Sequence, residues 1–248
     1  MISLDSYRRT AIALGRRALL VVLVSGLAAK AQSLSVLPVN VGLSPGQNAT
    51  TLTVTNHGTS ETAVQIRVYG WNQRDGEDQL TPSDMVVVSP PIASIAAGSS
   101  QVVRLILRQP PHGREATFRI LVDQIPPPAE PGIVHVVLRM SIPVFALPDT
   151  RAVPHLQFHI ERDADSAYLV ARNDGGRHEV IRNAVLSTND GRTLGTQSNA
   201  SPYVLAGATR RWPIAVQGAL PQASETLRLK AHADAGAVEQ QVRCVAGP

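Results

Sequence analysis

The hydrophobic positions of this chain follow a period of two residues and do not keep a helical period for long. In residues 133–145, IVHVVLRMSIPVF, the apolar even positions are Val134, Val136, Leu138 and Met140. Alternation over this length predicts a β-strand with one apolar face. Most such strands pack that face inside their own domain, so the pattern alone leaves open what this face contacts.

The rest of residues 32–147 holds similar short runs between turn residues: SLSVLPVNV, ATTLTVTN, TAVQIRVYGW, MVVVSPPIASIAAG, SQVVRLIL and EATFRILVDQI. Their spacing is typical of an immunoglobulin-like β-sandwich. The proline-rich segment IPPPAEPG, residues 125–132, predicts a loop between the last two strands. The dipeptide Pro90-Pro91 is a candidate place for a cis bond, which the sequence does not fix.

Residues 148–153 show no alternation and predict a linker. Beyond them, residues 154–248 return to short β-type runs with strong turn signals at Asn173-Asp174-Gly175 and Asn189-Asp190-Gly191. The pattern therefore predicts an all-β chain with two immunoglobulin-like β-sandwich domains in tandem, at residues 32–147 and 154–248.

The first 31 residues have a different pattern. Four arginines precede the apolar run ALLVVLVSGLA, and the segment ends in Ala29-Lys30-Ala31. This predicts a secretory signal peptide that is cleaved before Gln32. The segment YRRTAI lacks the bulky apolar pair of a twin-arginine signal, so we expect general secretion. The apolar run is too short to span a bilayer, so we expect a periplasmic product without membrane insertion.

The signal peptide also accounts for the charge of the chain. The full chain has 23 Lys and Arg against 19 Asp and Glu. Five of these bases and one acid lie in residues 1–31, which leaves 18 of each in the mature chain. This balance does not indicate a nucleic-acid partner. The single cysteine, Cys244, cannot form an internal disulfide, so we expect burial alone to hold the exported fold.

Motifs of catalysis and metal binding are missing from the sequence. The chain has no nucleophile elbow, phosphate-binding loop or zinc-protease helix motif. His155 and His159 would lie about 13 Å apart on a strand, too far for one metal ion. The segment DADS, residues 163–166, lacks most ligands of a calcium loop. We therefore expect no catalytic residues, no metal and no cofactor.

Several segments, in this order, resemble the periplasmic pilus-assembly chaperones of chaperone-usher systems, and above all their archaic branch: VQIRVYGWNQ (64–73), SPPIASIAAG (89–98), FRILVDQIP (118–126), RMSIPVFA (139–146) and YVLAGATRRW (203–212). The resemblance implies that residues 133–145 form a donor strand at a sheet edge. Such a strand lends Val134, Val136, Leu138 and Met140 to an incomplete pilin subunit, which is donor-strand complementation. The implied partners are pilin subunits and an outer-membrane usher, and self-association of the free chaperone stays open.

The resemblance also implies an anchor for the carboxylate terminus of the subunit. The better-known branch uses an arginine on the first strand and a lysine on the last, but here the first strand has no base and the lysine position is Pro143. In archaic relatives an arginine that matches Arg119 takes this role, and a guanidinium can hold a carboxylate through two parallel bonds. Arg104 and Arg139 are candidate assisting bases. The alternative for Arg119 is a surface ion pair with Asp123.

Two other functions compete with that of a chaperone. The chain could be a structural pilus subunit or surface adhesin, although pilins resemble single incomplete sandwiches and this chain predicts two complete ones. An enzyme or carbohydrate-binding sandwich would need an acid pair or an aromatic platform. Aromatic residues make up only 4% of the chain, which weakens a stacking site.

Overall fold

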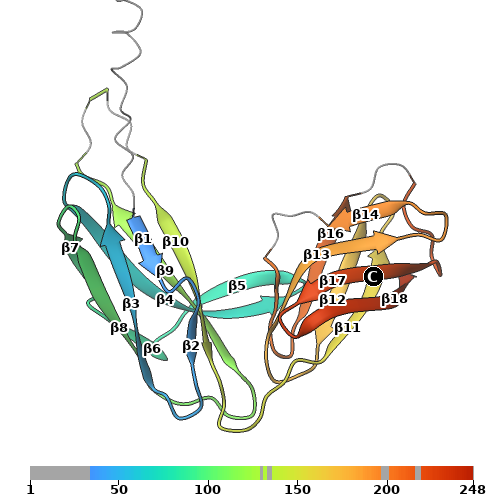
Figure 1. Cartoon of the computed structure of the whole chain (residues 1–248), viewed down its shortest axis with the longest axis horizontal. Helices are drawn as coiled ribbons and strands as arrows, with labels where there is room; N and C mark the ends of the chain where they lie inside the picture. Colours follow the sequence, from blue (N-terminus) through green and yellow to red (C-terminus); the bar gives the residue numbers. More distant parts are fainter. Residues whose placement is uncertain (1–33, 129–130, 133–135, 197–200, 216–218, 248) are drawn as a thin grey trace, which may run out of the picture.

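The computed structural model describes residues 34–128, 131–132, 136–196, 201–215 and 219–247. The predicted all-β fold is confirmed: two β-sandwich domains, which meet between Ala146 and Leu156, form a V-shaped molecule (Figure 1). Among the described residues, no helix is long and apolar enough to cross a membrane. The predicted signal peptide lies outside these residues.

The first domain packs a sheet of order β1-β3-β8-β6 against one of order β2-β10-β9-β4-β5, with β7 beside β4. Its strands are β1 (Leu34–Leu37), β2 (Val41–Leu43), β3 (Ala49–Asn56), β4 (Thr62–Arg74), β5 (Glu77–Pro82), β6 (Val86–Ser89), β7 (Ile92–Ile95), β8 (Ser100–Leu107), β9 (Ala116–Ile125) and β10 (Arg139–Ala146). The period of two residues produces the core. On β8, for example, Val103, Leu105 and Leu107 are buried, while the residues between them are exposed.

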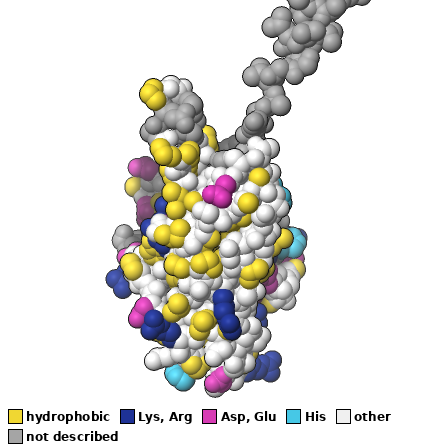
Figure 2. Space-filling view, turned by 90° about the vertical axis from the view of Figure 1, so that its left-hand side faces the viewer, with side chains coloured by type: hydrophobic (Ala, Val, Ile, Leu, Met, Phe, Trp, Pro, Cys, Tyr) yellow, Lys and Arg dark blue, Asp and Glu magenta, His cyan; other side chains and the backbone are white. Residues whose placement is uncertain are grey.

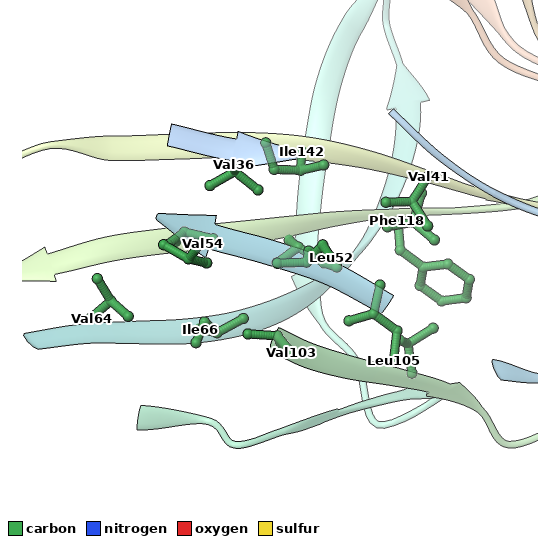
Figure 3. Packing of buried hydrophobic residues seen from close by; sticks show 14 of the residues in the cluster. Val36, Val41, Leu52, Val54, Val64, Ile66, Val103, Leu105, Phe118 and Ile142 are labelled. Carbon is green, nitrogen blue, oxygen red and sulfur yellow. The ribbon is translucent and has the colours of Figure 1, made fainter. Parts of the chain in front are cut away.

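The core of the first domain lies between these two sheets. Val36, Leu52 and Val54 from β1 and β3 face Val64, Ile66 and Ile142 from β4 and β10 (Figure 3). Aliphatic side chains dominate it, and Phe118 is an aromatic member of the cluster (Figure 3). With no disulfide in this domain, this buried apolar surface is its main source of stability.

The first predicted run, SLSVLPVNV, is two strands in different sheets. β1 pairs with β3, while β2 runs parallel to β10. Pro38 lies between them after a cis bond, and a proline cannot donate a hydrogen bond to a ladder. Near the Pro90-Pro91 pair, the cis bond is Ser89–Pro90.

The second domain is one sheet that curls around a single core, in the order β14-β16-β12-β11-β18-β17-β13-β15. β14 also pairs with β13, so the sheet closes on itself. Its strands are β11 (Leu156–Arg162), β12 (Ala167–Asn173), β13 (Glu179–Ser187), β14 (Thr193–Thr196), β15 (Tyr203–Val204), β16 (Thr209–Ala215), β17 (Thr226–Ala233) and β18 (Gly236–Ala246). Trp212 is buried in its core, and its indole nitrogen donates to the Ser201 carbonyl at 3.0 Å.

Backbone contacts join the two domains at the β4–β5 hairpin and at the linker. The β4–β5 hairpin crosses to the second domain (Figure 1), where the Gly76 carbonyl lies 3.4 Å from the Arg211 amide. The predicted linker is held by backbone bonds to the β12–β13 turn, since Gly176 donates to the Val153 carbonyl at 3.0 Å. Glu115 in turn donates its amide to the Gly176 carbonyl at 2.8 Å. The linker therefore lies in a fixed path rather than as a free tether.

Candidate functional site

β10 leaves half of one edge unpaired. It pairs with β9 over its full length, from Arg139 to Ala146. On its other side β2 pairs only with Val144, Phe145 and Ala146. Within the described chain, the edge from Arg139 to Pro143 therefore has no partner strand, and an open row of backbone N–H and C=O groups can accept another strand.

The even side chains of this strand divide into two groups. Ile142, Val144 and Ala146 are buried in the core of the first domain, and Met140 packs against that core from its edge. Before them, Leu138 and Val136 are 36% and 77% exposed. If the strand continued outward, these two side chains would extend the same apolar face beyond the domain. Val134 lies outside the described residues.

Among the described residues, β10 begins at Arg139, and residues 136–138 lie outside the strand, although the alternation predicted a strand there. Residues 133–135 lie outside the described residues. Two hydrogen bonds hold Leu138: the Gln124 backbone amide donates to the Leu138 carbonyl at 2.9 Å, and the Leu138 amide donates to the Gln124 side-chain oxygen at 3.3 Å. The register places Leu138 and Val137 opposite Gln124 and Ile125, the last two residues of β9.

Asp123 binds two arginines on the opposite face of the same sheet. One carboxylate oxygen accepts from Arg67 Nη2 at 2.5 Å, and the other accepts from Arg139 Nε. Burial alone would raise the pKa of Asp123, but the hydrogen bonds from Arg139 and Arg67 outweigh it and hold the pKa below its usual value. The predicted alternative, an ion pair between Arg119 and Asp123, is therefore wrong. Arg139, a candidate assisting base, already binds Asp123.

Arg119 lies at the inner end of the free edge. In the sheet it stands between Pro143 on β10 and Tyr69 on β4. Its guanidinium carbon lies 3.7 Å from the centre of the Trp71 ring and 5.4 Å from that of Tyr203, which belongs to the second domain. Arg119 forms no ion pair or side-chain hydrogen bond with any residue that the structure describes.

The environment of Arg119 suits an anion. Burial lowers its pKa, an effect that the nearby Asp78 and Tyr203 oppose. An arginine side chain nevertheless stays protonated in proteins. A half-buried cation without a bound carboxylate can take one through charge-assisted hydrogen bonds. Arg104, the other candidate assisting base, lies on the exposed face of β8 in the other sheet, so it does not share the face of Arg119.

Below Arg119, an apolar cluster joins the two domains. It consists of Trp71, Phe145 and Leu205, with Tyr203 packed against it, and we call it the domain junction. Phe145 on β10 stacks on His178 of the second domain, with ring centroids 3.6 Å apart and planes inclined by 12°. The inner end of β10 is thus fixed against the second domain.

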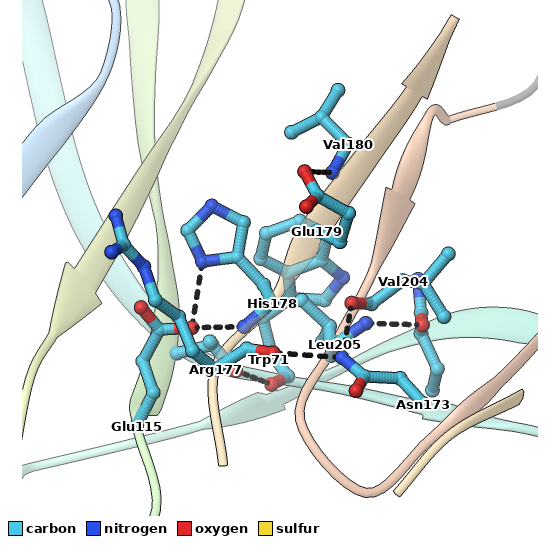
Figure 4. A network of polar contacts seen from close by, with 11 residues as sticks. Trp71, Glu115, Asn173, Arg177, His178, Glu179, Val180, Val204 and Leu205 are labelled. Carbon is cyan, nitrogen blue, oxygen red and sulfur yellow. Dashed lines mark hydrogen bonds and ion pairs between the residues drawn. The ribbon is translucent and has the colours of Figure 1, made fainter. Parts of the chain in front are cut away.

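Polar contacts surround the domain junction (Figure 4). The buried Glu115 carboxylate accepts from the His178 backbone amide at 2.9 Å and lies 2.7 Å from His178 Nδ1. Asn173 donates from its amide to the carbonyls of Arg177 and Val204 at 2.7 and 3.1 Å. Glu115 and His178 lie 63 residues apart along the chain, and Asn173 and Val204 lie 31 apart, so no local pattern predicts these contacts.

A second apolar surface covers the outside of the first domain. Ile92, Val102 and Ile106, on β7 and β8, are 56%, 54% and 38% exposed. Figure 2 shows hydrophobic side chains spread among polar ones over this side of the molecule. Val102 and Ile106 lie on the sheet opposite to that of Arg119, whereas Ile92 lies on β7, which pairs with β4 in the sheet of Arg119.

Comparisons with known proteins give a consistent result. The family model described as pili and flagellar-assembly chaperone, PapD N-terminal domain, matches residues 33–152. The chaperone protein FimB/FhaD of Bordetella pertussis is 30% identical over 139 residues, which are 52% of this chain and 55% of that protein. The chain thus matches about half the length of this curated relative.

Solved structures share the fold over most of the chain. One is the complex of the CsuC chaperone with the CsuE tip subunit from archaic chaperone-usher Csu pili of Acinetobacter baumannii, with TM-score 0.65, 22% identity, and coverage of 87% of this chain and 100% of that chain. Another is the Salmonella enterica SafA pilin in complex with the SafB chaperone, with TM-score 0.57, 18% identity, and coverage of 88% and 98%. At these identities the likeness concerns the fold.

Proposed function

Through residues 33–152 the chain belongs to the pili and flagellar-assembly chaperones with a PapD N-terminal domain, and from this membership we propose that it is a periplasmic chaperone of pilin subunits. It binds an incomplete subunit by donor-strand complementation, caps it and delivers it to an outer-membrane usher. Its activity is binding rather than catalysis. Export depends on the signal peptide in residues 1–31.

The free edge of β10 is the observation that carries this proposal. The last strand of a subunit would pair with Arg139–Pro143 and place its terminal carboxylate at Arg119, which stands beside Pro143. Val136 and Leu138, already exposed, would enter the groove of the subunit together with Met140 and Val134. Burial of four such side chains would contribute about 6–12 kcal/mol before the entropic costs of association.

The competing function of a pilus subunit has less support. Each domain encloses its own apolar core, whereas a subunit that needs a donated strand lacks part of one. The sheet of the second domain also closes through β14 and offers no equivalent apolar groove among the described residues.

Co-expression with a pilin from the same genome tests the proposal. We expect a one-to-one complex on size exclusion, and a pilin that aggregates or is degraded when produced alone. A complex that survives Leu138→Glu unchanged, with the chaperone folded by circular dichroism, would contradict strand donation. A matched control is Val102→Glu, a similar change on the exposed face of β8 in the other sheet, which we expect to leave capture intact.

A further inference from the structure

The candidate anchor is shared by the two domains. Trp71, from the first domain, lies under the Arg119 guanidinium, and Tyr203, from the second, lies beside it. The two rings meet edge to face, with centroids 5.2 Å apart and planes inclined by 81°. Arg119 therefore lies against two aromatic rings, one from each domain.

The position of Tyr203 is fixed through its backbone. The Gln73 side chain on β4 donates to the Tyr203 carbonyl at 2.9 Å and accepts from the Leu205 amide at 3.0 Å. The same amide nitrogen of Gln73 donates to Asp78 at 2.8 Å. Tyr203 and Val204 also pair with β13. The ring of Tyr203 thus stands on a segment held from both domains.

Aromatic rings around a guanidinium restrict its orientation without using its hydrogen bonds. A cation over a ring face is attracted by the ring quadrupole. The N–H groups at the edge of the guanidinium plane stay available for a carboxylate. An arginine held in one orientation loses less conformational entropy when it binds than a free one.

We infer that Tyr203 is a positioning residue for the subunit carboxylate: its ring holds the Arg119 guanidinium so that the fork faces the end of the incoming strand. This inference rests on the proposed function of Arg119 as the anchor. It makes the second domain part of the binding site rather than only a support.

Peptides that copy the last strand of the captured pilin test this inference. One peptide carries a free terminal carboxylate, and the other carries a terminal amide. We expect wild type to prefer the free acid by roughly ten- to a hundredfold, as a hydrogen-bonded charge pair would give. In Tyr203→Ala, the ratio of the affinities for the acid and amide peptides should fall toward one, while the affinity for the amide peptide stays unchanged.

Further variants separate the possible outcomes. Tyr203→Phe keeps the ring and should keep the preference. In an Arg119→Ala background, Tyr203→Ala should have no additional effect. Equal binding of both peptides by wild type would overturn the anchor itself and the inference with it. A wild-type preference that persists in Tyr203→Ala, or an equal loss for both peptides, would overturn the role of Tyr203 and leave the anchor in place.

A folding control keeps the test decisive. Circular dichroism and thermal melts should show Tyr203→Ala folded. If that variant does not fold, Gln73→Leu replaces it, because this change removes the side-chain bonds that hold Tyr203 while it leaves the ring present. A reduced preference in Gln73→Leu supports the inference, and an unchanged preference overturns it.

Discussion

Phe145 on β10 and His178 of the second domain lie ring on ring, with centroids 3.6 Å apart. Two residues along the strand, Pro143 begins the unpaired part of its edge. The same strand is therefore fixed at one end and open at the other.

Arg119→Ala should leave the chaperone folded and strongly reduce subunit capture. Without the guanidinium, a buried carboxylate would lose its charge partner, which costs about 2–5 kcal/mol in comparable pairs. Arg119→Lys should restore capture only in part, because an ammonium cannot form two parallel bonds. Pull-down of the pilin measures both.

Arg104→Ala is the matched control, since Arg104 is an exposed arginine on the other sheet. It should capture subunits as wild type does. Full capture by Arg119→Ala would move the anchor to another residue.

Val136→Glu should abolish pairing with the subunit, because it inserts a charge into an apolar groove at a cost of several kcal/mol. Val136 is 77% exposed, so the thermal melting of the free chaperone should not change. The neighbouring Val137→Glu is the control with the same substitution. On an extended strand its side chain would point to the opposite face, so we expect a much smaller loss of capture. Equal losses in the two variants would refute the assigned face.

Gly175→Ala should destabilise the connection between the domains. A methyl group there would lie 2.4 Å from the Val153 carbonyl oxygen and 2.5 Å from the His155 nitrogen. Backbone atoms cannot move aside as a flexible side chain can, so we expect a loss of about 1–3 kcal/mol in thermal or denaturant unfolding. Gly195→Ala serves as the control, because a methyl group there meets no atom within 4 Å. A Gly175→Ala melt equal to that of wild type would contradict the close packing of the linker.

Asp123 should contribute to the acid stability of the first domain. Its folded-state pKa lies below its unfolded value of about 3.9. The contribution is therefore present above that value and is lost as the pH falls through the folded-state pKa. Asp123→Asn should flatten the acid side of a plot of melting temperature against pH. Asp149→Asn, at an exposed acid without an ion pair among the described residues, should keep the slope of wild type.

Protein purified from the periplasm should begin at Gln32, because Ala29 and Ala31 satisfy the small-residue cleavage rule. Mass spectrometry of the intact protein measures this directly. A mass that includes residues 1–31 would exclude cleavage.

The sequence predicted most strands because their apolar faces alternate. It missed β5 and β14, whose segments EDQLTP and TLGT each hold a single leucine and therefore show no apolar alternation. Each forms because it pairs with a neighbouring strand, β5 with β4 and β14 with β13. Such pairing depends on tertiary structure, which a local pattern does not contain.

The site was predicted less completely than the fold. The role of Arg119 was predicted from the resemblance. Arg119 does not pair with Asp123, because β4 and β10 supply Arg67 and Arg139 as the partners of that acid. The two aromatic side chains that contact Arg119 are distant in sequence, since Trp71 lies on β4 and Tyr203 in the second domain. Only the arrangement of the two domains brings them together.

The unpaired edge of β10 also sets a length. It offers five positions from Arg139 to Pro143, and residues 136–138 would add three more if the strand continued outward. Together these eight positions would span about 26 Å of extended chain at 3.3 Å per residue. If Arg119 binds the terminal carboxylate of a docked strand, the length of that strand would be counted outward from its own terminus. A subunit with a shorter last strand would leave Val136 uncovered, and one with a longer strand would extend past the tip of the sheet. The chaperone would thus select its subunits by the length of their final strand as well as by its side chains.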